Sequence, residues 1–146
     1  MRYKLRIEWG DEQVIEIGAN NDEEKIITDV DVWMHTLNDN ATKKTNAMLA
    51  RVTVKGTIDA SKDSLKKNLS QKLRDIFEWS KDFNSGTTYR TIRLEMYENE
   101  FTFRKYKLDR VFLHDYKEQY GEGDQVGTFM LEITQQDNEL DTIEAV

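Results

Sequence analysis

The chain has 146 residues, of which 34% are charged and 38% hydrophobic, and its formal net charge is −7. This length predicts one domain, residues 1–146, with a single hydrophobic core, and an aromatic fraction of 10% argues against a disordered chain. The absence of cysteine excludes disulfides, thiolate zinc sites and cysteine nucleophiles.

The N-terminal sequence MRYKLRIEWG alternates charged and apolar residues. It therefore lacks the uninterrupted apolar run of a signal peptide or a membrane-spanning helix, and we expect synthesis in the cytoplasm with no membrane anchor. The same alternation predicts a strand over 3–9 with one wet face. A turn at 10–12 and a returning strand over 13–18 complete a hairpin.

Two further strands are expected before the middle of the chain. The first runs over 26–37, with Val30, Val32 and Met34 on one face and Asp29, Asp31, Trp33 and His35 on the other. The second runs over 48–58 and leads directly into a helix. Between them, NDNATKKTN at 38–46 has no apolar residue except Ala41 and predicts an extended polar loop.

The helix is expected over about 61–83, where apolar residues recur at helical spacing. Its predicted apolar stripe comprises Leu65, Leu69, Leu73, Ile76, Phe77 and Phe83. Ser61 or Asp63 can cap the start, and a turn containing Gly86 can end it. No second stripe of this length exists, so the helix must pack on β-structure.

Alternation resumes after the helix and predicts strands over 89–97, 101–116 and 129–133. The apolar parity changes within the long segment, which predicts a bulge near Lys105. A glycine-rich turn at 120–124 and an acidic tail over about 135–146 complete the chain. About seven strands with one inserted helix indicate a mainly β fold, an antiparallel β-barrel or sandwich with the helix packed on it.

Charge is distributed unevenly along the chain. The net charge is −6 over residues 1–42, +7 over 43–117 and −8 over 118–146. Separate faces for these segments would make the domain electrically two-sided and suited to head-to-tail association. If the segments interleave in the fold, the surface is instead mixed.

Motifs of catalysis and metal binding are missing. The only histidines are His35 and His114, no G-x-S-x-G occurs, and His114 and Asp115 are expected on opposite faces of a strand. Asp29 and Asp31 lack the loop of a hard-cation site, and the glycines near 121–127 precede no helix. We predict no catalytic residue, no cofactor and no metal. The basic residues of the helix (Lys62, Lys66, Lys67, Lys72, Arg74) are interpreted as a solvated face rather than a nucleic-acid stripe.

Three segments resemble type VI secretion tube proteins of the Hcp kind, whose fold phage tail-tube proteins share. VTVKGTIDASKDSL (52–65) resembles the family's approach to the helix, an aspartate followed by Ser-Pro and leucine, with Lys62 in place of the proline and the leucine further on. DVDVWMHTLND resembles a strand with aromatic residues. FTFRKYKLDRVFLHDYKEQYG is similar to a long strand pair with Val111 and Tyr116 near its end.

The resemblance implies a non-enzymatic subunit that forms rings, commonly hexameric, which stack into a hollow tube inside a contractile sheath. The implied partners are further copies of the chain, sheath and baseplate proteins, and DNA or effector cargo that passes without specific binding. The polar loop matches in position the extended loop that reaches the next ring. The residues expected at ring-stacking or subunit contacts are Asn38, Asp39, Asn40, Lys43, Lys44, Glu122 and Asp124.

Two other functions remain open at this stage. A monomeric β-barrel could bind a small apolar ligand in a cavity lined by Trp9, Trp33 and Phe103. A hydrolase could use a carboxylate pair, although nothing in the sequence selects one.

Overall fold

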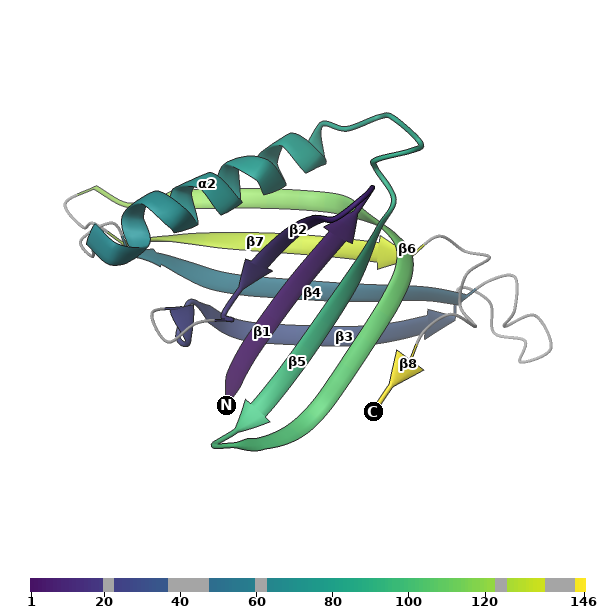
Figure 1. Cartoon of the computed structure of the whole chain (residues 1–146), viewed down its shortest axis with the longest axis horizontal. Helices are drawn as coiled ribbons and strands as arrows, with labels where there is room; N and C mark the ends of the chain where they lie inside the picture. Colours follow the sequence, from purple (N-terminus) through teal and green to yellow (C-terminus); the bar gives the residue numbers. More distant parts are fainter. Residues whose placement is uncertain (20–22, 37–47, 60–62, 123–125, 136–143) are drawn as a thin grey trace.

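In the computed structural model, the described residues are 1–19, 23–36, 48–59, 63–122, 126–135 and 144–146 (Figure 1). They form eight strands and one α-helix. In chain order these are β1 (Arg2–Trp9), β2 (Gln13–Ile17), β3 (Ile27–Thr36), β4 (Met48–Asp59), α2 (Asp63–Ser80), β5 (Arg90–Glu98), β6 (Phe101–Tyr120), β7 (Val126–Gln135) and β8 (Glu144–Ala145).

The strands form one antiparallel sheet in the order β2-β1-β5-β6-β7-β4-β3. β6 is 20 residues long and belongs to both halves, because its first part pairs with β5 and its second part with β7. Among the described residues, β2 and β3 end the order and do not pair with each other, so the sheet is not closed into a barrel. The predicted mainly β architecture with one packed helix is confirmed.

β6 bends where it passes from one half of the sheet to the other. Asp109 and Arg110 together oppose the single residue Thr91, and Arg110 has a φ of 52°. The buried Gln135 fixes the bend, since its Nε2 donates a hydrogen bond to the carbonyl of Asp109 at 3.0 Å. As a result β2, β1 and β5 cross over β7, β4 and β3 instead of continuing alongside them (Figure 1).

Two smaller irregularities lie on either side of this bend. In the first, Met96 and Tyr97 of β5 pair with Arg104 and Thr102 of β6, so Phe103 is an extra residue in β6. This bulge lies two residues before the one predicted at Lys105. In the second, Leu113 and Asp115 of β6 pair with the consecutive residues Ile133 and Glu132 of β7, so His114 is an extra residue in β6. Each extra residue shifts the in–out alternation of a strand, which explains the change of apolar parity in the sequence.

The core lies between the two halves of the sheet and beneath α2. Alternate residues of both halves supply it, as the sequence predicts for half-buried strands. The buried apolar side chains of the strands include Leu5, Ile7, Ile15, Ile17, Val52, Val54, Ile92, Leu94, Leu108, Val111, Leu131 and Ile133.

One contact within this core depends on a glycine. Gly56 of β4 pairs with Phe129 of β7, and a Cβ at Gly56 would lie 2.4 Å from Cζ of the phenyl ring. The same Cβ would lie 2.6 Å from the carbonyl oxygen of Ile26, which accepts a hydrogen bond from the amide of Thr57 at 2.9 Å. Only glycine leaves room for the ring at this position.

The helix is shorter than predicted and buries a different stripe. α2 ends at Ser80, so Phe83 lies beyond it and is 95% exposed, and Phe77 is 47% exposed. The prediction that both phenylalanines belong to the core stripe was therefore wrong. Among the helix side chains that the structure describes, residues 68–80, the buried stripe consists of Leu69, Leu73, Ile76 and Trp79, at the spacing of three or four residues that one helix face requires. The predicted stripe residue Leu65 lies outside the described side chains.

Two polar contacts hold α2 on the sheet. The ammonium of Lys72 contacts both carboxylate oxygens of Glu23, which is 2% exposed. The guanidinium of Arg90 lies between the rings of Trp9 and Trp79, 4.0 and 4.7 Å from their centroids. Burial lowers the pKa of Arg90 to about 10.

The C-terminal residues depart from the predicted polar tail. Residues 136–143 lie outside the described part of the chain, but β8 pairs with the first half of β6. Val146 and Lys105 exchange two backbone hydrogen bonds, at 2.8 and 3.0 Å. The tail therefore ends in a short strand, which two residues of sequence are too few to reveal.

Candidate assembly surfaces

Among the described residues, no strand pairs with the outer edge of either terminal strand of the sheet. β2 and β3 have 5 and 10 residues, and neither contains a proline, because the chain has none. Terminal strands commonly carry prolines or other devices that prevent pairing, since unpaired amides and carbonyls are a template for another strand. β3, the longer of the two strands, could therefore pair with a longer segment of another chain than β2 could.

The outward face of β3 carries an exposed tryptophan. Trp33 is 48% exposed, and its ring lies 4.5 Å from that of His35. The guanidinium of Arg51, on β4, lies 5.5 Å from the Trp33 ring, and its Nε is 2.9 Å from a carboxylate oxygen of Glu132. These contacts hold a large amphipathic side chain at the surface beside a free strand edge, where aromatic residues favour protein contacts.

Most of the residues predicted to stack rings lie outside the described part of the chain. These are Asn38, Asp39, Asn40, Lys43, Lys44 and Asp124. Glu122 is described, and it is exposed in the turn that follows β6. The structure does not bring these residues together in any described contact, so their role stays a prediction.

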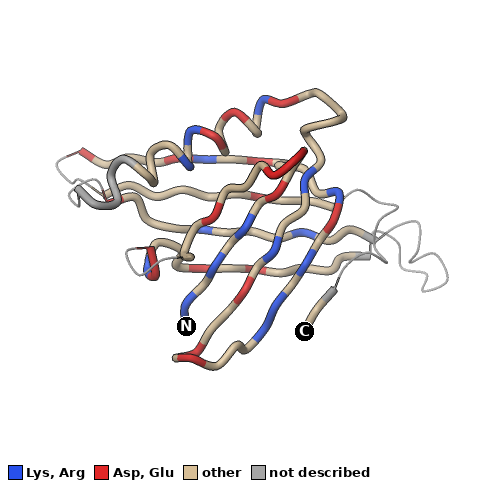
Figure 2. The backbone as a smooth tube through the Cα atoms, in the orientation of Figure 1, with Lys and Arg blue, Asp and Glu red and all other residues tan. Residues whose placement is uncertain are grey.

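Acidic and basic residues interleave along β2, β1 and β5 (Figure 2). Arg6 contacts the carboxylates of both Glu8 and Glu16, and Arg93 donates to Glu8 at 2.7 Å. Burial alone would raise the pKa of Glu8, but the hydrogen bonds from Arg93 and Arg6 outweigh it and lower this pKa. Along these strands the surface is therefore mixed rather than electrically two-sided.

The charges interleave because the sheet interleaves distant segments. β1, from the acidic first segment, pairs with β5, from the basic middle segment. The net charge of a sequence segment is thus not the charge of a face.

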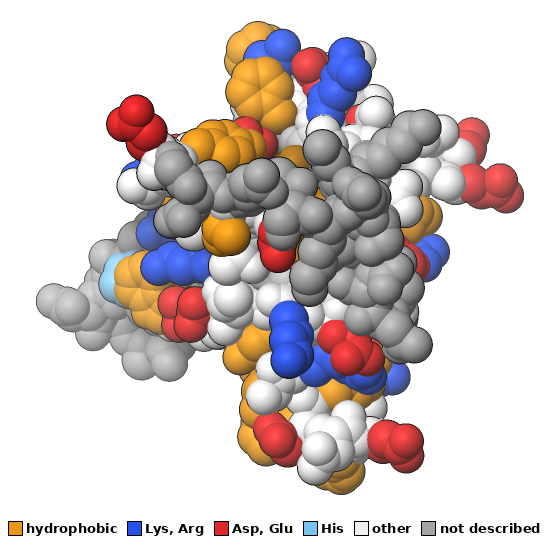
Figure 3. Space-filling model, turned by 90° about the vertical axis from the view of Figure 1, so that its left-hand side faces the viewer, with side chains coloured by type: hydrophobic (Ala, Val, Ile, Leu, Met, Phe, Trp, Pro, Cys, Tyr) orange, Lys and Arg blue, Asp and Glu red, His pale blue; other side chains and the backbone are white. Residues whose placement is uncertain are grey.

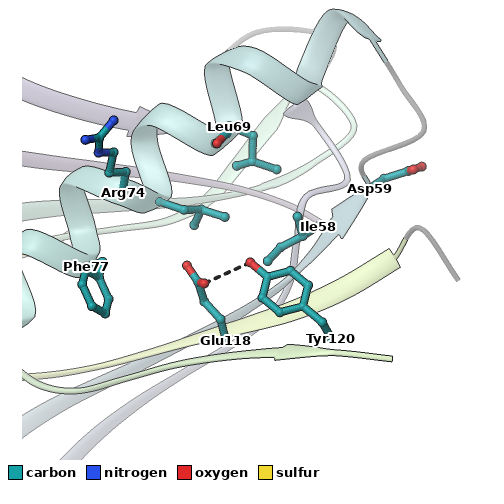
Figure 4. Close-up of a pocket in the computed structure, with 9 residues that line it drawn as sticks. Ile58, Asp59, Leu69, Arg74, Phe77, Glu118 and Tyr120 are labelled. Carbon is teal, nitrogen blue, oxygen red and sulfur yellow. Dashed lines mark hydrogen bonds between the residues drawn. The ribbon is translucent and has the colours of Figure 1, made fainter. Parts of the chain in front are cut away.

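An apolar groove of about 580 Å³ lies between α2 and the ends of β4 and β6 (Figure 4). Its lining comprises Ile58, Asp59, Leu69, Ser70, Leu73, Arg74, Phe77, Glu118 and Tyr120. The hydroxyls of Tyr116 and Tyr120 both donate to the Glu118 carboxylate, at 2.5 and 2.9 Å. Burial, followed by this hydrogen bond, raises the pKa of Tyr116.

Apolar side chains also reach the surface elsewhere, in separate places on the side shown in Figure 3. Trp33 and Phe103, two of the three residues proposed for an apolar ligand cavity, are 48% and 54% exposed. Trp9 instead packs under Arg90. The three do not enclose a common cavity, and the sheet is open, so that hypothesis was wrong in its geometry.

The described residues offer no group of three His, Asp or Glu that could hold a metal ion. His114 and Asp115 are both exposed, since the bulge at His114 breaks the alternation that was expected to place them on opposite faces. Of the basic helix residues, Lys72 is paired with Glu23 and Arg74 lines the groove. No helix among the described residues combines the length and the apolar character needed to cross a membrane.

Comparison with solved structures identifies the fold. No protein-family model and no curated protein sequence matches the chain. Hcp1 from Flavobacterium johnsoniae matches with a TM-score of 0.53 and 11% identity, over 92% of this chain and 90% of that one. Hcp1 from E. coli EAEC 042 matches with a TM-score of 0.56 and 10% identity, over 100% of this chain and 98% of that one.

The chain has an Hcp-like fold. A chain of the anti-feeding prophage baseplate, in a structure symmetrised six-fold, matches with a TM-score of 0.50 and 11% identity, over 99% of this chain and 92% of that one. The resemblance found in the sequence is thereby confirmed for the fold. At this level of identity an Hcp-like fold fixes the path of the backbone, and function has to be argued from this chain's own surfaces.

Proposed function

We propose that the chain is a structural subunit of a hollow tube in a contractile injection system or a phage tail-like particle, and that it acts by assembly and not by catalysis. The observation that carries the proposal is the Hcp-like fold, which extends over 92–100% of the chain. The two open strand edges support it, because a subunit that joins its neighbours on both sides needs two such edges.

The proposed ring joins β3 of one copy to β2 of the next, and has six members, as supported by the six-fold symmetry of the similar baseplate structure. Backbone hydrogen bonds would supply the contact, and the shorter β2 would limit it to about five residues. The loop 38–46, with Glu122 and Asp124, would contact the next ring. Sheath and baseplate proteins are the proposed outer partners.

Cargo would pass through the lumen without specific binding. The net charge of −7 supports this for DNA, since like charges repel phosphates. The chain would therefore be located in an assembled particle.

The test is light scattering coupled to size exclusion over a concentration series, with electron microscopy of the same peak. Rings or tubes are the expected result. A chain that stays monomeric at every concentration, and that does not extend preformed tube ends, would refute the proposal.

Two proline variants test the β3 edge within that assay. Asp31 and Met34 are both exposed and are three residues apart, so their amides face opposite sides of β3. One substitution, Asp31→Pro or Met34→Pro, therefore removes an amide facing β4 and lowers stability. The other removes an amide facing the open edge, and should block ring formation while leaving the stability nearly unchanged. Rings from the stable variant would refute edge pairing.

A further inference from the structure

The groove between α2 and the end of β6 is shaped to receive apolar side chains. The buried Leu69 and Leu73 line it, and Phe77 of the same helix lines it with 47% of its surface exposed. Leu69 and Phe77 both extend from α2 toward β6 (Figure 4).

Arg74 lies on the groove, and among the described residues it has no carboxylate partner. The groove also contains two carboxylates, but Glu118 accepts hydrogen bonds from the hydroxyls of Tyr116 and Tyr120, and Asp59 lies at the end away from Arg74 (Figure 4). An occupant that matches the Arg74 end of the groove therefore carries aromatic groups next to a carboxylate.

The turn between β5 and β6 has that chemistry. Phe101 and Phe103 are 68% and 54% exposed, which is unusual for two phenylalanines two residues apart. Glu100 precedes them in the turn and has no basic partner among the described residues. Asn99, with a φ of 55°, makes the turn tight, so these side chains stand at a fixed tip.

The tip and the groove lie at opposite ends of the molecule. In Figure 1 the β5–β6 turn is at the bottom, and α2 crosses the top. A contact between them cannot form within one copy. Between copies it is heterologous, because one copy offers the tip and the other the groove, and such contacts repeat into rings or filaments.

We propose that the β5–β6 tip of one copy inserts Phe101 and Phe103 into the α2 groove of the next, with Glu100 paired to Arg74. The volume of about 580 Å³ lies within the range of sites that bury small ligands, and two phenyl groups fit that size. The inference rests on the proposed self-assembly, but it assigns a contact that is separate from the strand edges and from the loop 38–46.

Charge reversal tests the pairing. Arg74→Glu alone and Glu100→Arg alone each place like charges together, and each should weaken assembly roughly tenfold or more. The double variant should recover assembly, and so should an equimolar mixture of the two single variants, because every contact then joins opposite charges. Lys55→Glu, which reverses the charge of an exposed lysine of β4 outside the groove, is the control and should assemble normally.

Removing the apolar part tests the insertion. Phe101→Ser with Phe103→Ser should weaken assembly roughly tenfold to a hundredfold, while urea unfolding of the variant stays close to that of the unchanged chain, since both side chains are exposed. Phe83→Ser, which removes a 95% exposed phenylalanine away from the tip, is the control.

Cross-linking locates the contact directly, because the chain has no cysteine of its own. Ser70→Cys in one copy and Phe101→Cys in another should oxidise to a mixed dimer, whereas Asp11→Cys in the turn after β1 should not pair with Ser70→Cys. Absence of the mixed disulfide, or unchanged assembly of the charge and phenylalanine variants, would overturn the tip-in-groove contact while leaving the tube proposal intact. A chain that never assembles would overturn both.

Discussion

Replacing Gly56 by alanine should weaken the core at the contact between β4 and β7. The added Cβ would lie 2.4 Å from the Phe129 ring and 2.6 Å from the Ile26 carbonyl, where ordinary contacts begin at 3.4 Å. Phe129 is 2% exposed and the carbonyl is held by the Thr57 amide, so neither can retreat easily. Overpacking of this kind costs about 3 kcal/mol, at the upper end of the usual range. For a chain of this size that lowers Tm by about 6–12 °C.

Urea unfolding followed by tryptophan fluorescence measures this cost. Gly121→Ala is the matched control, because a Cβ there meets nothing within 4 Å, and it should leave stability unchanged or raise it slightly. Adding Phe129→Leu to Gly56→Ala should cost less than the sum of the two single changes, since the smaller side chain frees the space. A Gly56→Ala variant as stable as the unchanged chain would refute the close packing of ring on glycine.

Three further predictions concern the helix anchor, the loop and the hydroxyl of Tyr116. Lys72→Met leaves the Glu23 carboxylate buried without its cation and should cost about 3 kcal/mol in urea unfolding; a loss below about 0.5 kcal/mol would contradict this role for the pair. Deleting 38–46 should abolish stacking of rings in electron micrographs while far-UV circular dichroism still reports a folded chain, and tubes of normal length would show that the loop is dispensable. Because burial raises the pKa of Tyr116 above its ordinary 10.0, ionisation of this hydroxyl favours the unfolded chain above about pH 10, so the contribution of Tyr116 to stability is constant below that pH and falls above it. Tyr116→Phe should flatten this alkaline decline in urea unfolding, and equal slopes for both proteins would exclude Tyr116 as its source.

The strands could be predicted from the sequence because each buries one face. Alternation alone located β1, β2, β4 and β7, since a half-buried strand repeats its environment every two residues. The helix was located by its stripe, but its end was misplaced. Phe77 and Phe83 fit the spacing of an apolar stripe about as well as Trp79 does. The end of α2 at Ser80 excludes Phe83, and Phe77 lies within α2 but on the side that lines the groove.

The order of the strands could not be predicted in this way. β1 pairs with β5 across more than eighty residues of chain, and no local pattern encodes that choice. The groove was missed for the same reason, because its lining comes from β4, α2 and β6. One signal was available: Phe101 and Phe103 next to the acidic turn ENE indicate apolar side chains at a hairpin tip, where burial within the same copy is difficult.

The continuity of β6 through both halves of the sheet has a consequence for how the molecule loses its structure. β5, β7 and β8 all hydrogen-bond to this one strand, so neither half has a complete set of backbone partners without it. A cut near the bend at 109–111 would separate the segment that pairs with β5 from the segment that pairs with β7. The two halves should therefore unfold together in a single transition.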